Sequence, residues 1–296
     1  MIQVQGLVHR YGSVQALAGL DLSVPDGEVF GVVGPDGAGK TTLLKILAGI
    51  LPVQQGSVRV LGEDVGRTQV LVRQSIGYIP QRFSLYRDLT VEENVDFYAR
   101  LYPRHPDFGK RKQELLDMVD LGRFRDRLAD ALSGGMKQKL ALLCALIHQP
   151  RLLLMDEPTT GVDPVSRREF WGLCFELQRS GLTVVSSTPY MDEAEQFDRV
   201  ALIDRGRFVR MGTTPEIRAS LPGEVLEVEC DAPFRARGAL QGYEVELFGD
   251  RIHVFVPHAA EARESVVQAL SAAGIRTSRA EPVPYSIEDV FLRVTR

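Results

Sequence analysis

The sequence predicts an α/β fold with a mixed sheet core, an antiparallel β edge and a helical insert, followed by a small C-terminal α+β domain. Three observations support this fold class. Residues 28–33 are apolar and β-prone, and they lead through a glycine-rich loop into a segment with apolar positions at helical spacing. A second apolar run, residues 152–155, ends at two carboxylates. Beyond residue 223, alternating apolar and polar segments return, which is typical of a separate unit with its own strands.

The composition is that of an ordinary globular protein. The chain has 296 residues, of which 44% are hydrophobic and 25% are charged. This length is compatible with one large domain or with two. The formal net charge of −4 gives no indication of a general affinity for nucleic acid. The three cysteines, at positions 144, 174 and 230, do not have the spacing of metal ligands.

We expect no segment of this sequence to span a membrane. The longest apolar run, residues 140–147, is far shorter than the roughly 18–20 residues that a bilayer requires. The N-terminus lacks the basic stretch and apolar core of a secretory signal. We therefore expect a soluble cytosolic protein that reaches any membrane by docking on a partner.

The antiparallel edge is predicted from residues 2–24, which alternate between apolar and polar and are interrupted at residues 11–13. This pattern indicates a hairpin that precedes the first buried strand. Tyr11 lies in the predicted turn. Its ring either stacks on an adenine or packs on the edge of the sheet, and its position alone does not separate the two.

The glycine-rich loop fits the spacing G-x-x-x-x-G-K-[ST] of a phosphate-binding loop, and it has the strand before it and the helix after it that this motif requires. Glycines allow several backbone N–H groups to point at one anion, and the helix start adds its partial positive charge. Lys40 can place a cation between the outer phosphates, and the Thr41 hydroxyl can ligate Mg²⁺. The positions predicted to contact nucleotide here are Gly34, Pro35, Asp36, Gly37, Ala38, Gly39, Lys40, Thr41 and Thr42.

Further candidate residues follow two other predicted strands. Gln81 comes at the carboxyl end of the strand at residues 76–79, where it can touch the metal or a water of a bound nucleotide. Asp156 suits the outer shell of Mg²⁺, and Glu157 suits polarising a water for attack on the γ-phosphate. The structural alternatives are a plain loop residue for Gln81 and a helix N-terminal acid pair for the two carboxylates.

A helical insert is expected at about residues 84–150, because helical patterns near residues 90–101 and 109–120 have no strand between them. At its end, Ser133 is a plausible N-cap, and Gly134 and Gly135 expose backbone N–H groups at a helix start. This is a second helix end that can receive an anion, although a plain linker is the alternative.

The first domain is placed at residues 1–220 and the second at residues 223–296, with a boundary near Leu221 and Pro222. The second domain has no catalytic constellation. His253 and His258 lie in or beside strand-like sequence there, and we expect surface or packing roles for them.

In combination, these motifs give residues 1–220 a resemblance to the nucleotide-binding subunit of ATP-binding cassette (ABC) transporters, which are P-loop NTPases. Residues 34–42 are similar to the Walker A motif, and residues 152–156 to Walker B with the catalytic glutamate at Glu157. Gln81 corresponds to the Q-loop, and Leu132 to Met136 to the cassette signature. Tyr11 falls at the adenine-stacking position, and residues 161–163 at the D-loop. The tail at residues 286–291 looks like the C-terminal extension of cassettes that serve drug or polysaccharide export.

The resemblance implies an ATP-binding and ATP-hydrolysing subunit of a membrane exporter, with ATP and Mg²⁺ as its cofactors. It implies Gln81 and Glu157 as catalytic residues and Thr41, Gln81 and Asp156 as metal ligands. In this family two cassettes pair head to tail, so Ser133, Gly134 and Gly135 of one contact the ATP of the other. A membrane-spanning permease is the further partner, contacted by the Gln81 segment and the helical insert. The resemblance thus implies that this chain is cytoplasmic and peripheral on the cytoplasmic face of the cell membrane.

Two positions depart from the family's pattern. Asp36 stands where asparagine is usual, and its charge repels a triphosphate unless the side chain points away. Pro189 stands where a switch histidine is usual, and proline has neither a donor nor an imidazole. Our hypothesis is that the chain's own site hydrolyses ATP slowly and that a second, non-identical cassette pairs with it.

Two other functions compete with this one. A catalytically weak regulatory subunit, paired with an active second cassette, is favoured by Pro189 and Asp36 and opposed by Glu157. A cassette ATPase of DNA repair or translation is disfavoured, because neither a long coiled-coil insertion nor a second cassette is present.

Overall fold

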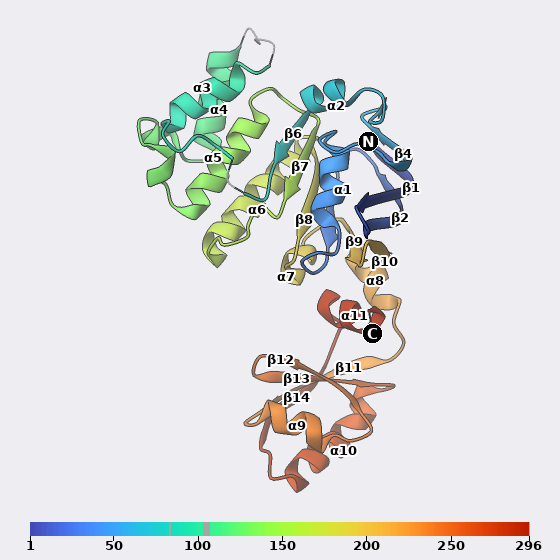
Figure 1. Cartoon of the computed structure of the whole chain (residues 1–296). Coiled ribbons are helices and arrows are strands. Elements are labelled where there is room, and N and C mark those ends of the chain that lie inside the picture. Colours follow the sequence, from blue (N-terminus) through green and yellow to red (C-terminus); the bar gives the residue numbers. More distant parts are fainter. Residues whose placement is uncertain (83, 103–106, 296) are drawn as a thin grey trace. The chain divides into compact units, whose positions relative to one another are not determined.

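The computed structural model describes residues 1–82, 84–102 and 107–295 (Figure 1). These residues form two compact units, Met1–Thr214 and Pro215–Arg296. The boundary expected from the sequence lies a few residues later, beyond the helix α8 (Thr214–Ala219). Each unit has its own hydrophobic core.

The first unit begins with a four-stranded antiparallel sheet in the order β2-β1-β4-β5. Its strands are β1 (Ile2–Tyr11), β2 (Val14–Val24), β4 (Gln55–Val60) and β5 (Glu63–Asp64). β1 and β2 form the hairpin expected from the alternating pattern, and Gly12 occupies its turn with a positive φ of 59°. The predicted antiparallel edge is therefore confirmed.

The central sheet has six strands in the order β10-β9-β3-β8-β7-β6. Neighbours from β9 to β6 run parallel, and β10 is antiparallel to β9, so the sheet is mixed as predicted. Its strands are β3 (Val29–Val33), β6 (Ile76–Ile79), β7 (Leu152–Asp156), β8 (Thr183–Thr188), β9 (Arg199–Asp204) and β10 (Arg207–Gly212).

Helix α1 (Lys40–Leu47) packs in one core with strands of both sheets. Leu43, Leu44, Ile46 and Leu47 are each 0% exposed. Full burial of one such side chain stabilises a fold by about 1.5–3 kcal/mol, so this short helix is fixed by packing. The glycine loop that precedes it is fixed in turn.

The parallel strands bring the candidate residues to one edge of the sheet. In the register, Val33 lies beside Thr188, Asp156 beside Ser187, and Ile79 beside Met155. The carboxyl ends of β3, β6, β7 and β8 are therefore adjacent, as expected at the ligand-binding edge of an α/β sheet.

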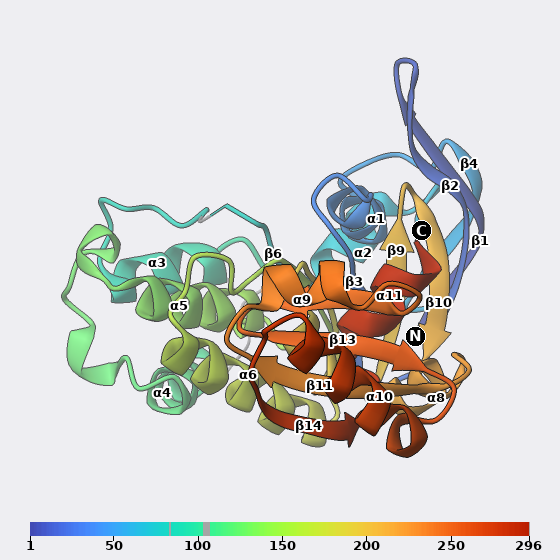
Figure 2. The ribbon, with the colours of Figure 1, turned by 90° about the horizontal axis from the view of Figure 1, so that it is seen from below.

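The expected helical insert contains α3 (Val91–Ala99), α4 (Phe108–Met118) and α5 (Gly134–Leu146), which lie together away from the hairpin sheet (Figures 1 and 2). Thr90 and Glu93 form a capping box that fixes the start of α3. Lys112 links α4 to α3, because its Nζ lies 2.6 Å from Glu92 Oε1 and 2.8 Å from Asp96 Oδ1 of α3. The remaining helices of the first unit are α2 (Gln69–Ser75), α6 (Pro164–Arg179) and α7 (Met191–Ala194).

The second unit contains a four-stranded antiparallel sheet in the order β12-β13-β11-β14. Its elements are β11 (Glu224–Cys230), α9 (Pro233–Ala239), β12 (Glu244–Phe248), β13 (Arg251–Val256), α10 (Ala259–Ala272), β14 (Thr277–Val283) and α11 (Ile287–Val294). Residues of α9 and α10 share its hydrophobic core with the strands. This is the α+β arrangement that the sequence predicts.

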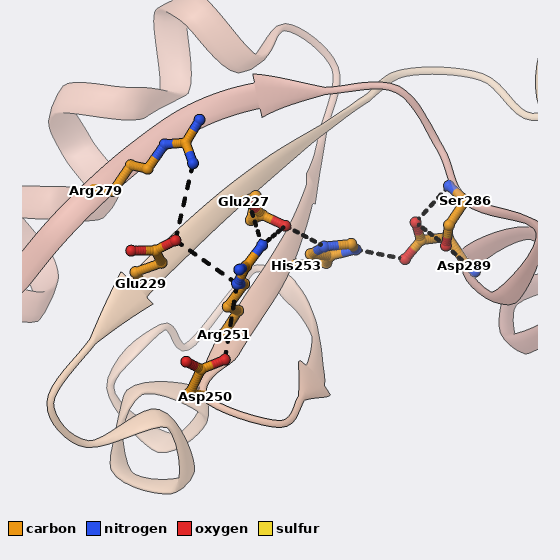
Figure 3. A network of polar contacts seen from close by, with 8 residues as sticks. All are labelled: Glu227, Glu229, Asp250, Arg251, His253, Arg279, Ser286 and Asp289. Atoms are coloured by element: carbon orange, nitrogen blue, oxygen red, sulfur yellow. Dashed lines mark hydrogen bonds and ion pairs between the residues drawn. The ribbon is translucent and has the colours of Figure 1, made fainter. Parts of the chain in front are cut away.

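His253 of β13 is buried in the second unit and bonded on both sides (Figure 3). Its Nδ1 lies 2.7 Å from Asp289 Oδ1 on α11, and its Nε2 lies 3.3 Å from Glu227 Oε2 on β11. Asp289 also belongs to a capping box with Ser286. The ring therefore connects α11 to the sheet through hydrogen bonds as well as filling space in the core.

Candidate functional site

The glycine loop needs glycine at two positions in particular. A Cβ on Gly34 would lie 2.1 Å from the carbonyl oxygen of Ile203. Gly39 has a φ of +111°, and a Cβ there would lie 2.6 Å from the carbonyl oxygen of Ala16. Side chains are excluded from both positions by fixed backbone, so the loop packs tightly against β2 and β9.

Lys40 lies inside the loop, with 3% of its surface exposed. Its Nζ donates to the carbonyl oxygens of Gly34 at 2.8 Å and Pro35 at 3.0 Å, and it lies 3.0 Å from Glu157 Oε1. The Asp36 carboxylate is 3.9 Å from the same nitrogen, but its side chain is 90% exposed. Asp36 can therefore turn toward solvent, which reduces its repulsion of an anion in the loop.

The first turn of α1 is open to an anion. Within the described chain, no side chain caps this helix, and no acid lies in its first turn. The N-terminal N–H groups of a helix carry a partial positive charge of roughly half an elementary charge. Together with Lys40, this turn has the charge and the N–H donors that suit phosphate oxygens.

Asp156 and Thr41 provide oxygens suited to a divalent cation. The Thr41 hydroxyl donates to Asp156 Oδ1 at 3.0 Å, and Ser187 Oγ donates to the same oxygen at 2.7 Å. Asp156 Oδ2 is buried and has no hydrogen-bond partner among the described residues. Burial raises the pKa of Asp156, and the two hydroxyls only partly offset this effect. A carboxylate oxygen left in this state fits Mg²⁺, which takes carboxylate and hydroxyl ligands.

Glu157 is also buried, and its carboxylate is held by two groups from other elements. Lys40 pairs with Oε1 at 3.0 Å, and Gln81 Nε2 donates to Oε2 at 2.9 Å. The Glu157 N–H donates to the Ser187 carbonyl at 3.2 Å and to Ser187 Oγ at 3.0 Å. The structure thus brings Lys40, Gln81 and Glu157 together in one polar cluster at the carboxyl edge of the sheet.

Pro189 lies directly beside the start of the loop. It follows β8, and the Gly34 N–H donates to the carbonyl oxygen of Thr188 at 3.3 Å. Its ring nitrogen carries no hydrogen, so the side chain offers no donor to a ligand in the loop. The turn is closed by the Tyr190 N–H, which donates to Thr188 Oγ1 at 3.0 Å.

The structure does not bring the second anion-receptive helix start to the loop. Ser133 caps α5 as predicted, with its Oγ accepting from the Met136 N–H at 3.3 Å. Gly135 packs against α6, where a Cβ would lie 2.6 Å from Ser166 Oγ. In both views α5 and α1 lie on opposite sides of the central strands (Figures 1 and 2). Ligand contacts by Ser133, Gly134 and Gly135 remain a prediction.

Tyr11 ends β1 and is 49% exposed. Its ring packs edge-on against His9, with centroids 4.9 Å apart. Neither of the two roles considered for it is tested by this contact, so adenine stacking remains a prediction.

Comparison with known proteins identifies the family. The family model described as ABC transporter matches residues 17–160. The daunorubicin resistance ATP-binding protein DrrA3 of Streptomyces coeruleorubidus is 36% identical over 99% of this chain and 95% of its own length. The chain belongs to the ABC transporter family. Within the part of this ABC chain that the structure describes, no helix combines the length and apolarity needed to cross a bilayer.

Two further relatives extend this comparison. The probable multidrug ABC transporter ATP-binding protein YbhF of Escherichia coli is 41% identical over 83% of this chain, which spans only 46% of YbhF. The ABC cassette MJ0796, solved as a dimer in a post-hydrolysis state with ADP and Pi, is 27% identical with a TM-score of 0.65. That match covers 72% of this chain and 98% of the solved one. Both the ABC family and the ABC ATPase fold expected from the motifs are thus confirmed.

Several polar residues of this ABC cassette were not identified from the sequence. Ser187 bonds Asp156 and Glu157, while Thr159, Arg167 and Thr188 converge on the carboxylate of Glu193. A signal was present in the run Ser186, Ser187 and Thr188, because three consecutive hydroxyl residues end a fully buried strand. Buried hydroxyls need partners.

Proposed function

We propose that this chain is the ATP-binding and ATP-hydrolysing subunit of an ABC exporter. The observation that carries the proposal is the convergence of Lys40, Thr41, Gln81, Asp156 and Glu157 on one edge of the sheet. These residues come from three separate strand ends. Such a cluster of cation, hydroxyl, amide and carboxylates suits phosphoryl transfer to water.

Binding would use the loop from Gly34 to Thr42. Its N–H groups and the start of α1 receive the phosphates, and Lys40 exchanges its carbonyl contacts for phosphate oxygens. The residues that would hold Mg²⁺ are Thr41, Asp156 and Gln81, and the bound ion would neutralise phosphate charge. Tyr11 is proposed to stack on the adenine.

Hydrolysis would depend on the release of Glu157 from Lys40. Once Lys40 contacts phosphate, the Glu157 carboxylate keeps its hydrogen bond from Gln81. Its other oxygen is then free to accept a hydrogen bond from a water. Glu157 can polarise that water for attack on the γ-phosphate, and Gln81 keeps the carboxylate in place.

The second cassette is proposed to be non-identical to this one. Pro189 supplies no donor beside the loop, so hydrolysis in the chain's own site would be slow. Ser133, Gly134 and Gly135 would complete the site of the partner cassette, because they lie far from the loop of their own chain. A catalytically weak regulatory subunit is the second candidate function, and Pro189 is the observation in its favour.

We propose a membrane-spanning permease as the other partner, to which this chain binds at the cytoplasmic face of the membrane. A cavity of about 190 Å³ reaches Pro80, the residue before Gln81, and is lined mainly by apolar and aromatic side chains. It lies between the end of β6, α3 and α5, and its lining includes Tyr78, Pro80, Tyr98, Tyr102 and Cys144. The relatives' names, multidrug transport and daunorubicin resistance, support export as the direction.

The experiment that tests this function measures equilibrium ATP binding and single-turnover hydrolysis by the full chain. We expect ATP binding that Lys40→Ala abolishes and hydrolysis that Glu157→Gln abolishes. Binding without any hydrolysis would support the regulatory subunit instead. Absence of both would overturn the proposal, and co-purification with a membrane-spanning protein tests the permease.

A further inference from the structure

Glu157 has an unusual backbone conformation that its surroundings must maintain. Its φ is +49°, in the left-handed region that non-glycine residues rarely occupy. Such a conformation persists only when neighbouring contacts hold it. On its N-terminal side, Ser187 holds the Glu157 N–H through both its carbonyl oxygen and its Oγ.

On the C-terminal side of Glu157, the backbone is held by a hydrogen bond from Thr159, two residues later. This side chain is 1% exposed, and its hydroxyl donates to Glu193 Oε1 at 2.6 Å. The Thr160 N–H returns to the Glu157 carbonyl at 3.2 Å, which makes residues 157–160 a closed turn. A shift of Thr159 would therefore move the backbone of Glu157.

Glu193 joins three elements through one buried carboxylate. Its Oε2 accepts from Thr188 Oγ1 at 2.6 Å, at the end of β8. Its Oε1 accepts from Thr159 and also from Arg167 Nε of α6 at 3.1 Å. Glu193 is 1% exposed, so its charge depends on these partners for stabilisation.

Arg167 is fixed in turn by the segment that follows Pro189. Its Nη2 lies 3.0 Å from Asp192 Oδ2, and its guanidinium carbon lies 4.2 Å from the centre of the Tyr190 ring. A planar guanidinium can make both contacts at once, whereas a lysine ammonium cannot. The Pro189 segment, α6 and the loop after Glu157 are therefore linked around Glu193.

We propose that Glu193 is a positioning residue for ATP hydrolysis, which holds the loop after Glu157 against the Thr188 end of β8. This inference rests on the proposed hydrolysis by this chain. Glu193 and Thr159 act through the backbone of Glu157 and take no part in holding the phosphates. Their loss should therefore lower the rate of hydrolysis and leave ATP affinity unchanged.

The length of the Glu193 side chain separates positioning from a simple charge effect. Glu193→Asp keeps the charge but shortens the reach, so the carboxylate cannot span Thr159 and Thr188 together. Glu193→Gln keeps the reach and loses the charge opposite Arg167, which still has Asp192. A positioning role predicts that the Asp variant is the more impaired, and a charge role predicts the reverse.

The test uses the full chain and two measurements. Hydrogen exchange of the backbone at residues 157–163 reports the loop without requiring activity. Single-turnover hydrolysis and equilibrium ATP binding report the chemistry. We expect Thr159→Val and Glu193→Asp to speed exchange and to slow hydrolysis by roughly 10- to 100-fold, with ATP affinity unchanged.

Two matched variants serve as controls. Thr159→Ser keeps the hydroxyl that Thr159→Val removes, so it should behave like the parent. Arg168→Lys changes an exposed residue next to Arg167 and should also behave like the parent. Three results would each overturn the inference. They are unchanged hydrogen exchange in Thr159→Val, a smaller loss of hydrolysis rate in Glu193→Asp than in Glu193→Gln, and a loss of ATP affinity as large as the loss of hydrolysis rate. A parent chain that binds ATP without hydrolysing it would refute the proposed activity, while the exchange data would still decide whether Glu193 holds the loop.

Discussion

Lys40 Nζ and Glu157 Oε1 lie 3.0 Å apart, and the two side chains are only 3% and 4% exposed. The lysine proposed to bind phosphate and the glutamate proposed to polarise water are thus paired with each other inside the site. Ligand phosphates would have to separate this pair, so the entry of nucleotide and the release of Glu157 become one event.

The first prediction concerns the stability of that pair. Lys40→Ala leaves a buried carboxylate with the Gln81 amide but without its cation, and removing one partner of a buried pair costs about 3 kcal/mol. The double variant Lys40→Ala with Glu157→Gln should recover most of this loss, because the remaining buried group is neutral. Denaturant unfolding of the nucleotide-free chain measures both. A double variant no more stable than Lys40→Ala alone would contradict the argument.

The second prediction concerns Pro189. Introducing an imidazole as Pro189→His, beside the Gly34 end of the loop, should raise the single-turnover rate by about tenfold or more. Pro189→Ala is the control, because it removes the proline ring without adding a donor. An alanine variant as fast as the histidine variant would show that backbone restriction, and not the missing donor, limits the rate.

The third prediction concerns the cation site. Thr41→Val and Asp156→Asn each remove an oxygen ligand or its charge, so hydrolysis should require a higher Mg²⁺ concentration, with the larger effect in Asp156→Asn. Titration of the hydrolysis rate with Mg²⁺ gives the comparison. Exposed Asp36 supplies the control, since Asp36→Asn should leave the Mg²⁺ requirement unchanged. Equal Mg²⁺ requirements in all variants would contradict the proposal that Asp156 and Thr41 hold Mg²⁺.

The fourth prediction is a pH dependence of the second unit's stability. Burial, the largest single effect, lowers the pKa of His253, but hydrogen bonds and charges from Asp289 and Glu227 together outweigh it and raise the pKa. A raised pKa means that the folded state binds the proton more tightly. The stabilisation is therefore complete below the unfolded value of about 6.5 and is lost as pH rises through the folded value.

Thermal unfolding of the full chain at a series of pH values measures this effect. The His253→Gln variant should lose the part of the pH dependence that lies above about pH 6.5. The matched control is His258→Gln, which replaces the exposed histidine that precedes α10 in the same unit. An unchanged dependence in His253→Gln would show that the ring does not bind a proton on folding.

The phosphate loop, the hairpin and the carboxylates after β7 could be predicted because each depends on residues close together in sequence. The glycine spacing from Gly34 to Gly39 and the apolar run before Asp156 are complete local signals. Ser187 and Glu193 could not be predicted in this way. Thr188 is close to Glu193 in sequence, but Asp156 lies 31 residues from Ser187 and Thr159 lies 34 residues from Glu193. These long-range contacts appear only once β7 and β8 are paired in register.

The head-to-tail role of Ser133, Gly134 and Gly135 shows a different limit. Capping of α5 by Ser133 follows from local chemistry and is confirmed. A contact between this helix start and a nucleotide requires a second cassette, so neither the sequence nor the single chain tests it. A structure of the paired cassettes would test it.

The position of β8 between β3 and β7 has a consequence for how insertions would be tolerated. This strand sets the spacing between the loop after Val33 and the carboxylates after Met155. One extra residue ahead of Ser187 would rotate each later side chain of the strand to the opposite face, turning Ser187 away from Asp156 and Thr188 away from Glu193. Insertions and deletions should therefore be selected against in β8 and tolerated in exposed turns such as the β12–β13 turn at Gly249 and Asp250.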